Sequence, residues 1–411
     1  MQCSPRNFTE TSTTVAKYVS KYCLQRGSSV SLTIDLGQFQ SSALEISPIH
    51  EDIAEDLECN RPGCMTRYQL HRLDISASLS MIYAEFAALP SPSTSSCEKI
   101  AGCSQKNRYT LWPIRETRVR LSSSYRASCN SAAEEVCQSY INANYILDSN
   151  SELMYIAAEG PMPNTINDFW SMVLQERTPV IVMVTNLEEK PCGAKLAIKK
   201  CEKYWPDSHA CYGKIDVTIV STNFHSGVQI RHIVLNCGDL EHHVRHIWFT
   251  EWLDHRLPMQ HITQLLKIIA AMESYRNEYR RLFSHTAPVL VHCSAGIGRT
   301  CTFIAIALGV DQLCKTPENI DVFSTVSRLR RQRFGAVQLP GQYAFIYLVL
   351  QRMERLLPEL CAENDQDKFP ACLTFSVFDF QTNNSQELLC GKQRIEAGTE
   401  KFLDSLFYNI T

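Results

Sequence analysis

The 411-residue sequence lacks the features that mark several special classes of protein. It has no uninterrupted apolar run of about 18 residues and no charged-then-apolar leader, so we expect no membrane span and no secretory signal. Its net charge is only −3, which gives no electrostatic reason to expect nucleic acid as a partner. We therefore expect a soluble, cytoplasmic protein.

The 18 cysteines form no Cys-x-x-Cys pair. The looser pairs Cys59/Cys64 and Cys97/Cys103 have no histidines nearby at zinc-binding spacing. We therefore expect no metal and no cofactor. Scattered cysteines of this kind favour a reducing compartment, in which thiols stay free.

Apolar patterning is weak at both ends of the chain and strong between them. We interpret residues 1–73 as an N-terminal extension of unknown role and residues 359–411 as a polar C-terminal tail. Strand-like and helix-like segments alternate through 74–358, which predicts one α/β domain with a central sheet covered by helices on both faces. The clearest segments are a helix over 75–89, a buried strand over 180–184 and a helix through 262–272.

Residues 291–300, Val-His-Cys-Ser-Ala-Gly-Ile-Gly-Arg-Thr, are the most informative segment. The apolar run 288–291 predicts a buried strand before it, and 303–308 predicts a buried helix after it. A strand, a glycine-bearing loop and a helix N-terminus can bind an anion, because the first N–H groups of the helix are unpaired. The positive end of the helix dipole also favours a thiolate at Cys293. Arg299 can donate two parallel hydrogen bonds to a phosphate. This combination indicates phosphoryl transfer through a cysteinyl-phosphate.

The decapeptide resembles the active-site loop of the protein tyrosine phosphatase family, and the resemblance extends from about Tyr83 to Met353. Further markers occur in the family's order: Lys106–Tyr109, Tyr140–Tyr145, Glu159–Pro161, Asp168–Trp170, Lys200–Pro206 and Val337–Tyr343. The first two are absent from the short dual-specificity branch, so the chain resembles the tyrosine-specific type. The resemblance implies a central twisted mixed β-sheet flanked by helices on both faces. It also implies a cysteine-dependent protein-tyrosine-phosphatase that acts in signal transduction on tyrosine-phosphorylated proteins.

The resemblance also implies the residues of the substrate pocket. The loop residues that would surround the phosphate are Ser294, Ala295, Gly296, Ile297, Gly298 and Arg299. Tyr109 would line a pocket too deep for phosphoserine to reach the thiolate. Two residues later the family usually has an aspartate that holds the substrate backbone, whereas this chain has Leu111. The orientation of a bound peptide therefore stays open.

Release of the tyrosine phenolate requires a general acid, which the family supplies from a mobile Trp-Pro-Asp loop. Asp207 matches these letters, but we assign it to a scaffold strand, Lys200–Pro206, and not to the chemistry. Asp254, in the segment 252–258, lies in the expected place and is our candidate acid. In that loop Leu253 replaces a proline and Arg256 replaces a glycine, so we expect slow or salt-sensitive turnover.

For the second step the family positions a water with two glutamines, which match Gln338 and Gln342. Asp254 would then act as base, and Thr300 would donate a hydrogen bond to the thiolate. Glu189 is a weaker match to a glutamate that holds the loop arginine.

Other interpretations remain open beside this one. The departures at Leu253 and Arg256 would fit a pseudophosphatase, which binds phosphotyrosine but turns over negligibly. A lipid phosphatase fits less well, because its loop is usually lysine-rich. The runs Arg115–Arg120 and Arg328–Arg333 are predicted as solvated faces or scaffold hydrogen bonds, and Cys301 as a packing residue.

Overall fold

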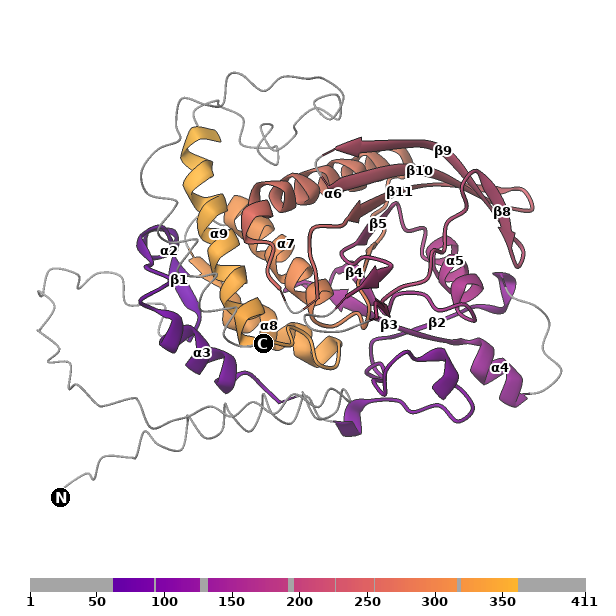
Figure 1. Cartoon of the computed structure of the whole chain (residues 1–411), viewed down its shortest axis with the longest axis horizontal. Coiled ribbons are helices and arrows are strands. Elements are labelled where there is room, and N and C mark those ends of the chain that lie inside the picture. Colours follow the sequence, from indigo (N-terminus) through magenta and orange to yellow (C-terminus); the bar gives the residue numbers. More distant parts are fainter. Residues whose placement is uncertain are drawn as a thin grey trace, which may run out of the picture.

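A computed structural model of the chain describes residues 62–91, 94–125, 132–190, 196–225, 227–254, 256–315 and 319–360 (Figure 1). Most of the predicted extension, 1–73, and nearly all of the predicted tail, 359–411, lie outside these residues. The division of the chain at 74 and 358 therefore stays a proposal. Within the described ranges, no helix combines the length and the apolar character needed to cross a lipid bilayer.

A mixed sheet of nine strands forms the centre of the fold, in the order β2-β3-β4-β12-β5-β11-β10-β9-β8 (Figure 1). Its strands are β2 (Arg118–Arg120), β3 (Tyr140–Leu147), β4 (Leu153–Ala158), β5 (Val180–Met183), β8 (His209–Tyr212), β9 (Ile215–His225), β10 (Val228–Cys237), β11 (Leu240–Phe249) and β12 (Val289–His292). The neighbours β4, β12, β5 and β11 run parallel, and the remaining pairs are antiparallel.

The central strands are buried on both faces. Along β12, Val289 and Val291 lie in one hydrophobic cluster, whereas Leu290, between them, lies in a second cluster. Alternate side chains of a strand point to opposite faces, so the two clusters lie on opposite sides of the sheet. Burial on both sides also explains why this segment is a continuous apolar run in the sequence.

Helices lie on both sides of the sheet, as Figure 1 shows. The helices that contribute to the first cluster include α3 (Leu79–Ala88), α6 (Ile262–Phe283), α7 (Arg299–Lys315), α8 (Val322–Gln332) and α9 (Pro340–Leu360). On the other face, α5 (Ile166–Gln175) packs its buried side into the second cluster. The α/β architecture with helices on both faces is therefore confirmed.

Shorter elements complete the fold. Strand β1 (Cys64–Thr66) pairs with β13 (Asn319–Asp321), and β6 (Glu188–Glu189) pairs with β7 (Ile198–Lys199). Helix α2 (Arg67–Arg72) begins with a capping box on Thr66 and lies against α9, whereas α4 (Ala132–Gln138) precedes β3.

Two predicted segments need correction. The helix predicted over 75–89 begins only at Leu79, because the carboxylate of Asp74 accepts the Ala77 N–H at 3.0 Å and holds a turn there. Ile75 is buried in the core without being helical. The predicted scaffold strand Lys200–Pro206 is an irregular segment, whose Lys200 and Cys201 amides share the Leu187 carbonyl.

Candidate active site

The loop 293–298 joins the end of β12 to the start of α7, as predicted. In open α/β sheets, ligands bind beyond the carboxyl ends of the parallel strands, and β12 lies between two parallel neighbours. Cys293, at the head of the loop, is only 3% exposed.

The carbonyl groups of this loop all face the surrounding scaffold. Their hydrogen bonds are Gly160 N–H to Ser294 O at 2.9 Å, Arg333 to Ala295 O at 3.1 Å and to Gly296 O at 3.0 Å, Val337 N–H to Ile297 O at 3.1 Å, and Thr302 N–H to Gly298 O at 2.9 Å. With the carbonyls turned outward, the loop amides and the helix N-terminus offer donors to a bound anion.

Gly296 is required by the way the loop lies on the sheet. Its φ of 69° is in the left-handed region, and a Cβ built on it would lie 2.1 Å from the carbonyl oxygen of Ala158. No other residue fits at this contact.

Arg333 is a loop-holding residue that sequence reasoning did not single out. Besides the two loop carbonyls, its guanidinium donates to Asn142 Oδ1 at 2.8 Å and to Asn144 Oδ1 at 2.9 Å. Burial lowers the pKa of Arg333, but its polar partners replace the lost water. Scaffold hydrogen bonds were one of the two interpretations of this basic run, and Arg330 is buried as well. Nothing in the sequence, however, indicated that Arg333 is the arginine that holds the loop.

A buried series of hydrogen bonds holds the backbone carbonyl of Cys293. His292 contacts the Cys293 carbonyl through Nδ1 at 3.2 Å and the Tyr204 hydroxyl through Nε2 at 2.7 Å. The same hydroxyl lies 2.8 Å from His246 Nε2, and His246 Nδ1 lies 3.4 Å from an Arg231 nitrogen.

The hydrogen-bond partners fix the position of each proton from His292 to Arg231. A carbonyl only accepts, so the proton of neutral His292 is on Nδ1, and its Nε2 accepts from Tyr204. Tyr204 must then accept from His246 Nε2–H, which leaves His246 Nδ1 to accept from Arg231. Burial lowers the pKa of His292 to about 4 and that of His246 well below its usual range, so both rings are neutral near pH 7.

The predicted anion clamp, Arg299, is buried and held by three partners. Its Nη1 donates to Glu189 Oε1 at 2.6 Å and to the Trp252 carbonyl at 2.7 Å, and its Nη2 lies 3.4 Å from Asp254 Oδ1. Burial alone would lower the pKa of Arg299, but Asp254, Cys293 and Glu189 raise it above its usual value. Glu189 therefore contacts the loop arginine as the resemblance implied.

Asp254 lies at the loop, and a lysine that sequence reasoning missed holds it there. Its Oδ2 accepts from Lys200 Nζ at 2.6 Å, and its backbone N–H donates to Glu189 Oε2 at 2.7 Å. Lys200 begins the family-like segment Lys200–Pro206, but its partner lies 54 residues away in the sequence. Asp207 has a different setting, because its side chain is 95% exposed and pairs with Lys203.

The two departures in the acid loop do not keep it from docking. The Trp252 indole donates to the Arg256 carbonyl at 3.1 Å, and the Trp252 carbonyl reaches Arg299. Arg256 keeps a negative φ, so the freedom that glycine would offer is not needed in this arrangement.

The predicted pocket residues gather around the same loop. The Tyr109 hydroxyl lies 3.0 Å from Ser294 Oγ, and the amide of Arg108, its neighbour, donates to Glu159 at 3.0 Å. On the opposite side, a Cβ at Gly298 would lie 3.0 Å from the Gln342 side chain and 3.3 Å from that of Gln338.

Gln338 follows a strained residue. Val337 has a φ of 52°, which is rare for a β-branched side chain, and its amide donates to the loop carbonyl of Ile297. Gln342 Oε1 accepts the Gln338 amide at 3.0 Å. These constraints direct the segment toward the loop.

Thr300 and Cys301 lie in the first turn of α7, and both are fully buried. Among the described residues Thr300 Oγ has no hydrogen-bond partner, so its donation to the thiolate stays a prediction. Cys301 and Cys293 are both free thiols, and burial raises the pKa of Cys301 to about 12.

Comparison with known proteins agrees with this site. Residues 103–352 match the family model described as protein-tyrosine phosphatase. The chain is 39% identical to receptor-type tyrosine-protein phosphatase R of Mus musculus over 87% of its own length and 53% of that protein. It is 34% identical to tyrosine-protein phosphatase non-receptor type 5 of Rattus norvegicus (81% of this chain, 86% of the relative). It is also 34% identical to non-receptor type 7 of Homo sapiens (82% and 88%).

The chain thus spans about half the length of the receptor-type relatives and most of the two non-receptor ones. The matched region includes Cys293, Arg299, Asp254 and both glutamines. The chain therefore belongs to the protein-tyrosine phosphatase family.

Proposed function

We propose that this chain hydrolyses phosphotyrosine in proteins through a cysteinyl-phosphate intermediate. The observation that carries the proposal is a loop whose carbonyls face outward, with Cys293 at its head and Arg299 at its end. The names of two relatives, non-receptor phosphatases, support the further proposal that it acts in the cytoplasm.

In the first step, the Cys293 sulfur attacks phosphorus while the bond from phosphorus to the tyrosine oxygen breaks. Asp254 donates its proton to the departing phenolate. In the docked loop, Arg299 and Lys200 both favour the ionised form of Asp254. A bound phosphate dianion competes for Arg299, and this favours the protonated acid when substrate is present.

In the second step, a water held by Gln338 and Gln342 attacks phosphorus and gives a proton to the Asp254 carboxylate. The bond from sulfur to phosphorus breaks, which releases inorganic phosphate and restores the thiolate. Glu189 and the Trp252 carbonyl keep Arg299 oriented through both steps. The Tyr109 side chain, beside Ser294, limits access to long aromatic phosphoesters.

The pseudophosphatase alternative rested on poor closure of the acid loop. The contacts of Trp252 and Asp254 with Arg299 give it no support.

The direct test is steady-state hydrolysis of a phosphotyrosine peptide by the wild type, Cys293→Ser and Asp254→Ala. We expect no turnover by Cys293→Ser, because serine cannot act as the thiolate nucleophile. We expect Asp254→Ala to lose a factor of about 10²–10⁴ in kcat while still binding the peptide. A wild type that binds the peptide but turns over no faster than Cys293→Ser would exclude the proposal.

Asp207→Ala is the matched control. Asp207 follows Trp205-Pro206 much as Asp254 follows Trp252-Leu253, but its side chain is exposed. Its kcat should stay within about twofold of wild type. A loss as large as that of Asp254→Ala in a folded protein would overturn the choice of acid.

A further inference from the structure

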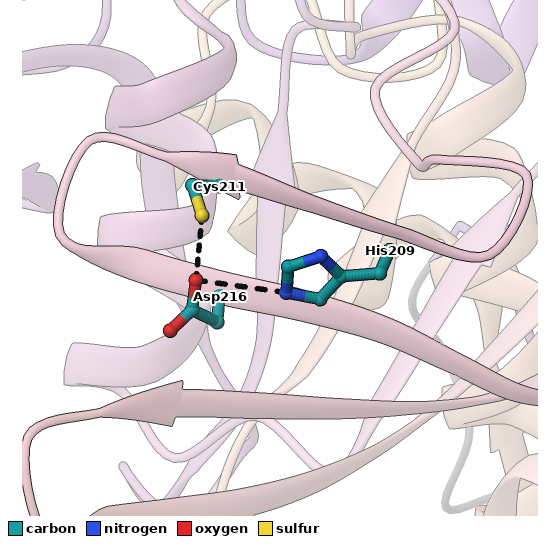
Figure 2. Close-up of side chains that lie close together, drawn as sticks. All are labelled: His209, Cys211 and Asp216. Atoms are coloured by element: carbon teal, nitrogen blue, oxygen red, sulfur yellow. Dashed lines mark hydrogen bonds and ion pairs between the residues drawn. The ribbon is translucent and has the colours of Figure 1, made fainter.

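A second group of reactive side chains lies on the β8–β9 hairpin, away from the phosphatase loop. Figure 2 shows His209, Cys211 and Asp216 grouped over this hairpin. Strand β8 is the outer edge of the sheet, and four strands separate it from β12. The group therefore has no part in the proposed hydrolysis.

Strand geometry brings the three side chains to one face. His209 and Cys211 are two residues apart on β8, so they point to the same side of the sheet. Asp216 on β9 is directly opposite Cys211 in the strand register. A directly opposed pair and a diagonal neighbour are within side-chain reach of one another.

The ligand atoms are already close together. Cys211 Sγ lies 2.7 Å from Asp216 Oδ1, and His209 Nε2 lies 3.7 Å from the same oxygen (Figure 2). One ligand atom from each of the three residues lies within 4.8 Å of the others. Ligands around a tetrahedral zinc ion are about 3.4–3.8 Å apart, given bond lengths of about 2.0–2.3 Å. Side-chain movements of about 1 Å would therefore bring the three ligand atoms to the spacing found around an ion.

We propose that His209, Cys211 and Asp216 bind a zinc ion or a similar borderline-soft divalent cation. An imidazole, a thiolate and a carboxylate form a donor set that suits zinc and is unsuited to magnesium or calcium, which take oxygen ligands. Three protein ligands leave the fourth position for water. Because the His209 and Asp216 side chains are about half exposed (54% and 49%), the ion is accessible from solvent.

The hairpin holds the ligands in place before an ion binds. Its two-residue turn, Gly213-Lys214, connects the paired residues Tyr212 and Ile215, and Gly213 takes a φ of 65°. Glycine at the first loop position is typical of tight hairpins. Tyr212 also contacts the buried Trp170 ring of α5, so the hairpin is anchored on the core.

Binding must displace a proton. Without metal, the Cys211 thiol donates to Asp216 Oδ1. When the sulfur–metal bond forms, the S–H bond breaks and its proton passes to solvent. The site is therefore expected to bind one ion with release of about one proton per ion.

The test uses cobalt(II) alone as a spectroscopic probe and zinc(II) alone as its competitor. Both are added to the full chain carrying Cys293→Ser, which removes the catalytic thiol as a competing ligand. We expect one cobalt ion per chain, with a thiolate-to-cobalt charge-transfer band and the visible bands of a four-coordinate ion, both abolished by zinc.

His209→Ala and Asp216→Asn should each weaken the zinc Kd by about tenfold or more, and Cys211→Ser should remove the charge-transfer band. These positions are exposed, and circular dichroism will verify that each variant is folded.

Matched controls are Cys237→Ser, a free thiol on the same sheet, and His243→Ala, which lies beside His232 on β10–β11. Both should leave the stoichiometry and the Kd unchanged. A charge-transfer band that persists in Cys211→Ser, or a zinc Kd unchanged by all three ligand substitutions, would overturn the proposal. Neither result would affect the proposed hydrolysis.

Discussion

At the scale of single residues, the active site depends on contacts with residues that are distant in the sequence. Cys293 and Arg299 are recognisable from the local sequence, because one loop contains both. Lys200, Glu159 and Arg333 are not, since each meets its partner across a long stretch of chain. Sequence spacing cannot show such contacts, and only the topology of the sheet brings them together.

Lys200→Met should show how much the lysine contributes to positioning Asp254. The variant keeps the length of the side chain but loses a charge-assisted hydrogen bond of 2.6 Å to Asp254. We expect kcat to fall about three- to tenfold with little change in KM, because the docked acid loop is weakened.

Lys199→Met is the control, since Lys199 is half exposed and pairs with Glu202. Its kcat should equal that of the wild type. Equal kcat values for both variants would mean that Lys200 does not position the acid.

Glu159→Gln tests a buried carboxyl beside the substrate loop. Burial raises the pKa of Glu159 to about 8 in the folded chain, above its usual value near 4.5. The stability contributed by its protonated form is then complete below about pH 4.5 and is lost as the pH rises toward 8. Glutamine cannot ionise and still offers an oxygen to the Arg108 amide.

The free energy of unfolding of Glu159→Gln, relative to wild type, should therefore increase from pH 5 to pH 8. Urea titrations at several pH values measure it. A constant difference across that range would show that Arg108 and Arg333 keep the carboxylate ionised.

At the scale of elements, the most regular segments were predictable. The helix through 262–272 lies within α6, and the strand over 288–291 coincides with β12 within one residue. The helix over 75–89 was predicted too long. Its apolar stripe begins at Ile75, which lies inside the turn that the Asp74 side chain holds. Cysteine spacing could not indicate the proposed ligand group of β8 and β9, because the pairing of two strands brings its residues together.

Arg256→Gly tests the idea that this departure slows the acid loop. Arg256 has a negative φ in the docked loop, so glycine relieves no strain there. Glycine instead gives the undocked loop more conformations, which disfavours docking by about 0.5–1 kcal/mol. We expect kcat to fall about two- to fivefold, and a rise in kcat would mean that Arg256 obstructs closure.

At the scale of the whole molecule, the first and last described helices are joined. The Gln351 side chain, buried in α9, donates to the Leu70 carbonyl at 2.9 Å and to the Leu73 carbonyl at 2.7 Å. Residues before Asp74 therefore contribute to the fold, which the weak patterning of that region did not indicate.

Gln351→Leu should destabilise the protein by about 1–3 kcal/mol, because it removes the buried side-chain donor that joins the Leu70 and Leu73 carbonyls to α9. Arg355→Met is its control, since Arg355 also donates to α2 but through an exposed hydrogen bond, and it should change stability by less than about 0.5 kcal/mol. Urea unfolding measures both. The kcat of each should match wild type, and a Gln351→Leu variant as stable as wild type would mean that this contact is not needed.

The outward-facing carbonyls of the phosphatase loop have a consequence for inhibitor chemistry. The backbone of this loop offers a guest N–H donors and turns its acceptors away, so it favours ionised groups over acidic groups that stay protonated at neutral pH. Compounds that carry fully ionised tetrahedral oxyanions should compete best with substrate. Masking their charge to improve cell entry will weaken their binding to the loop.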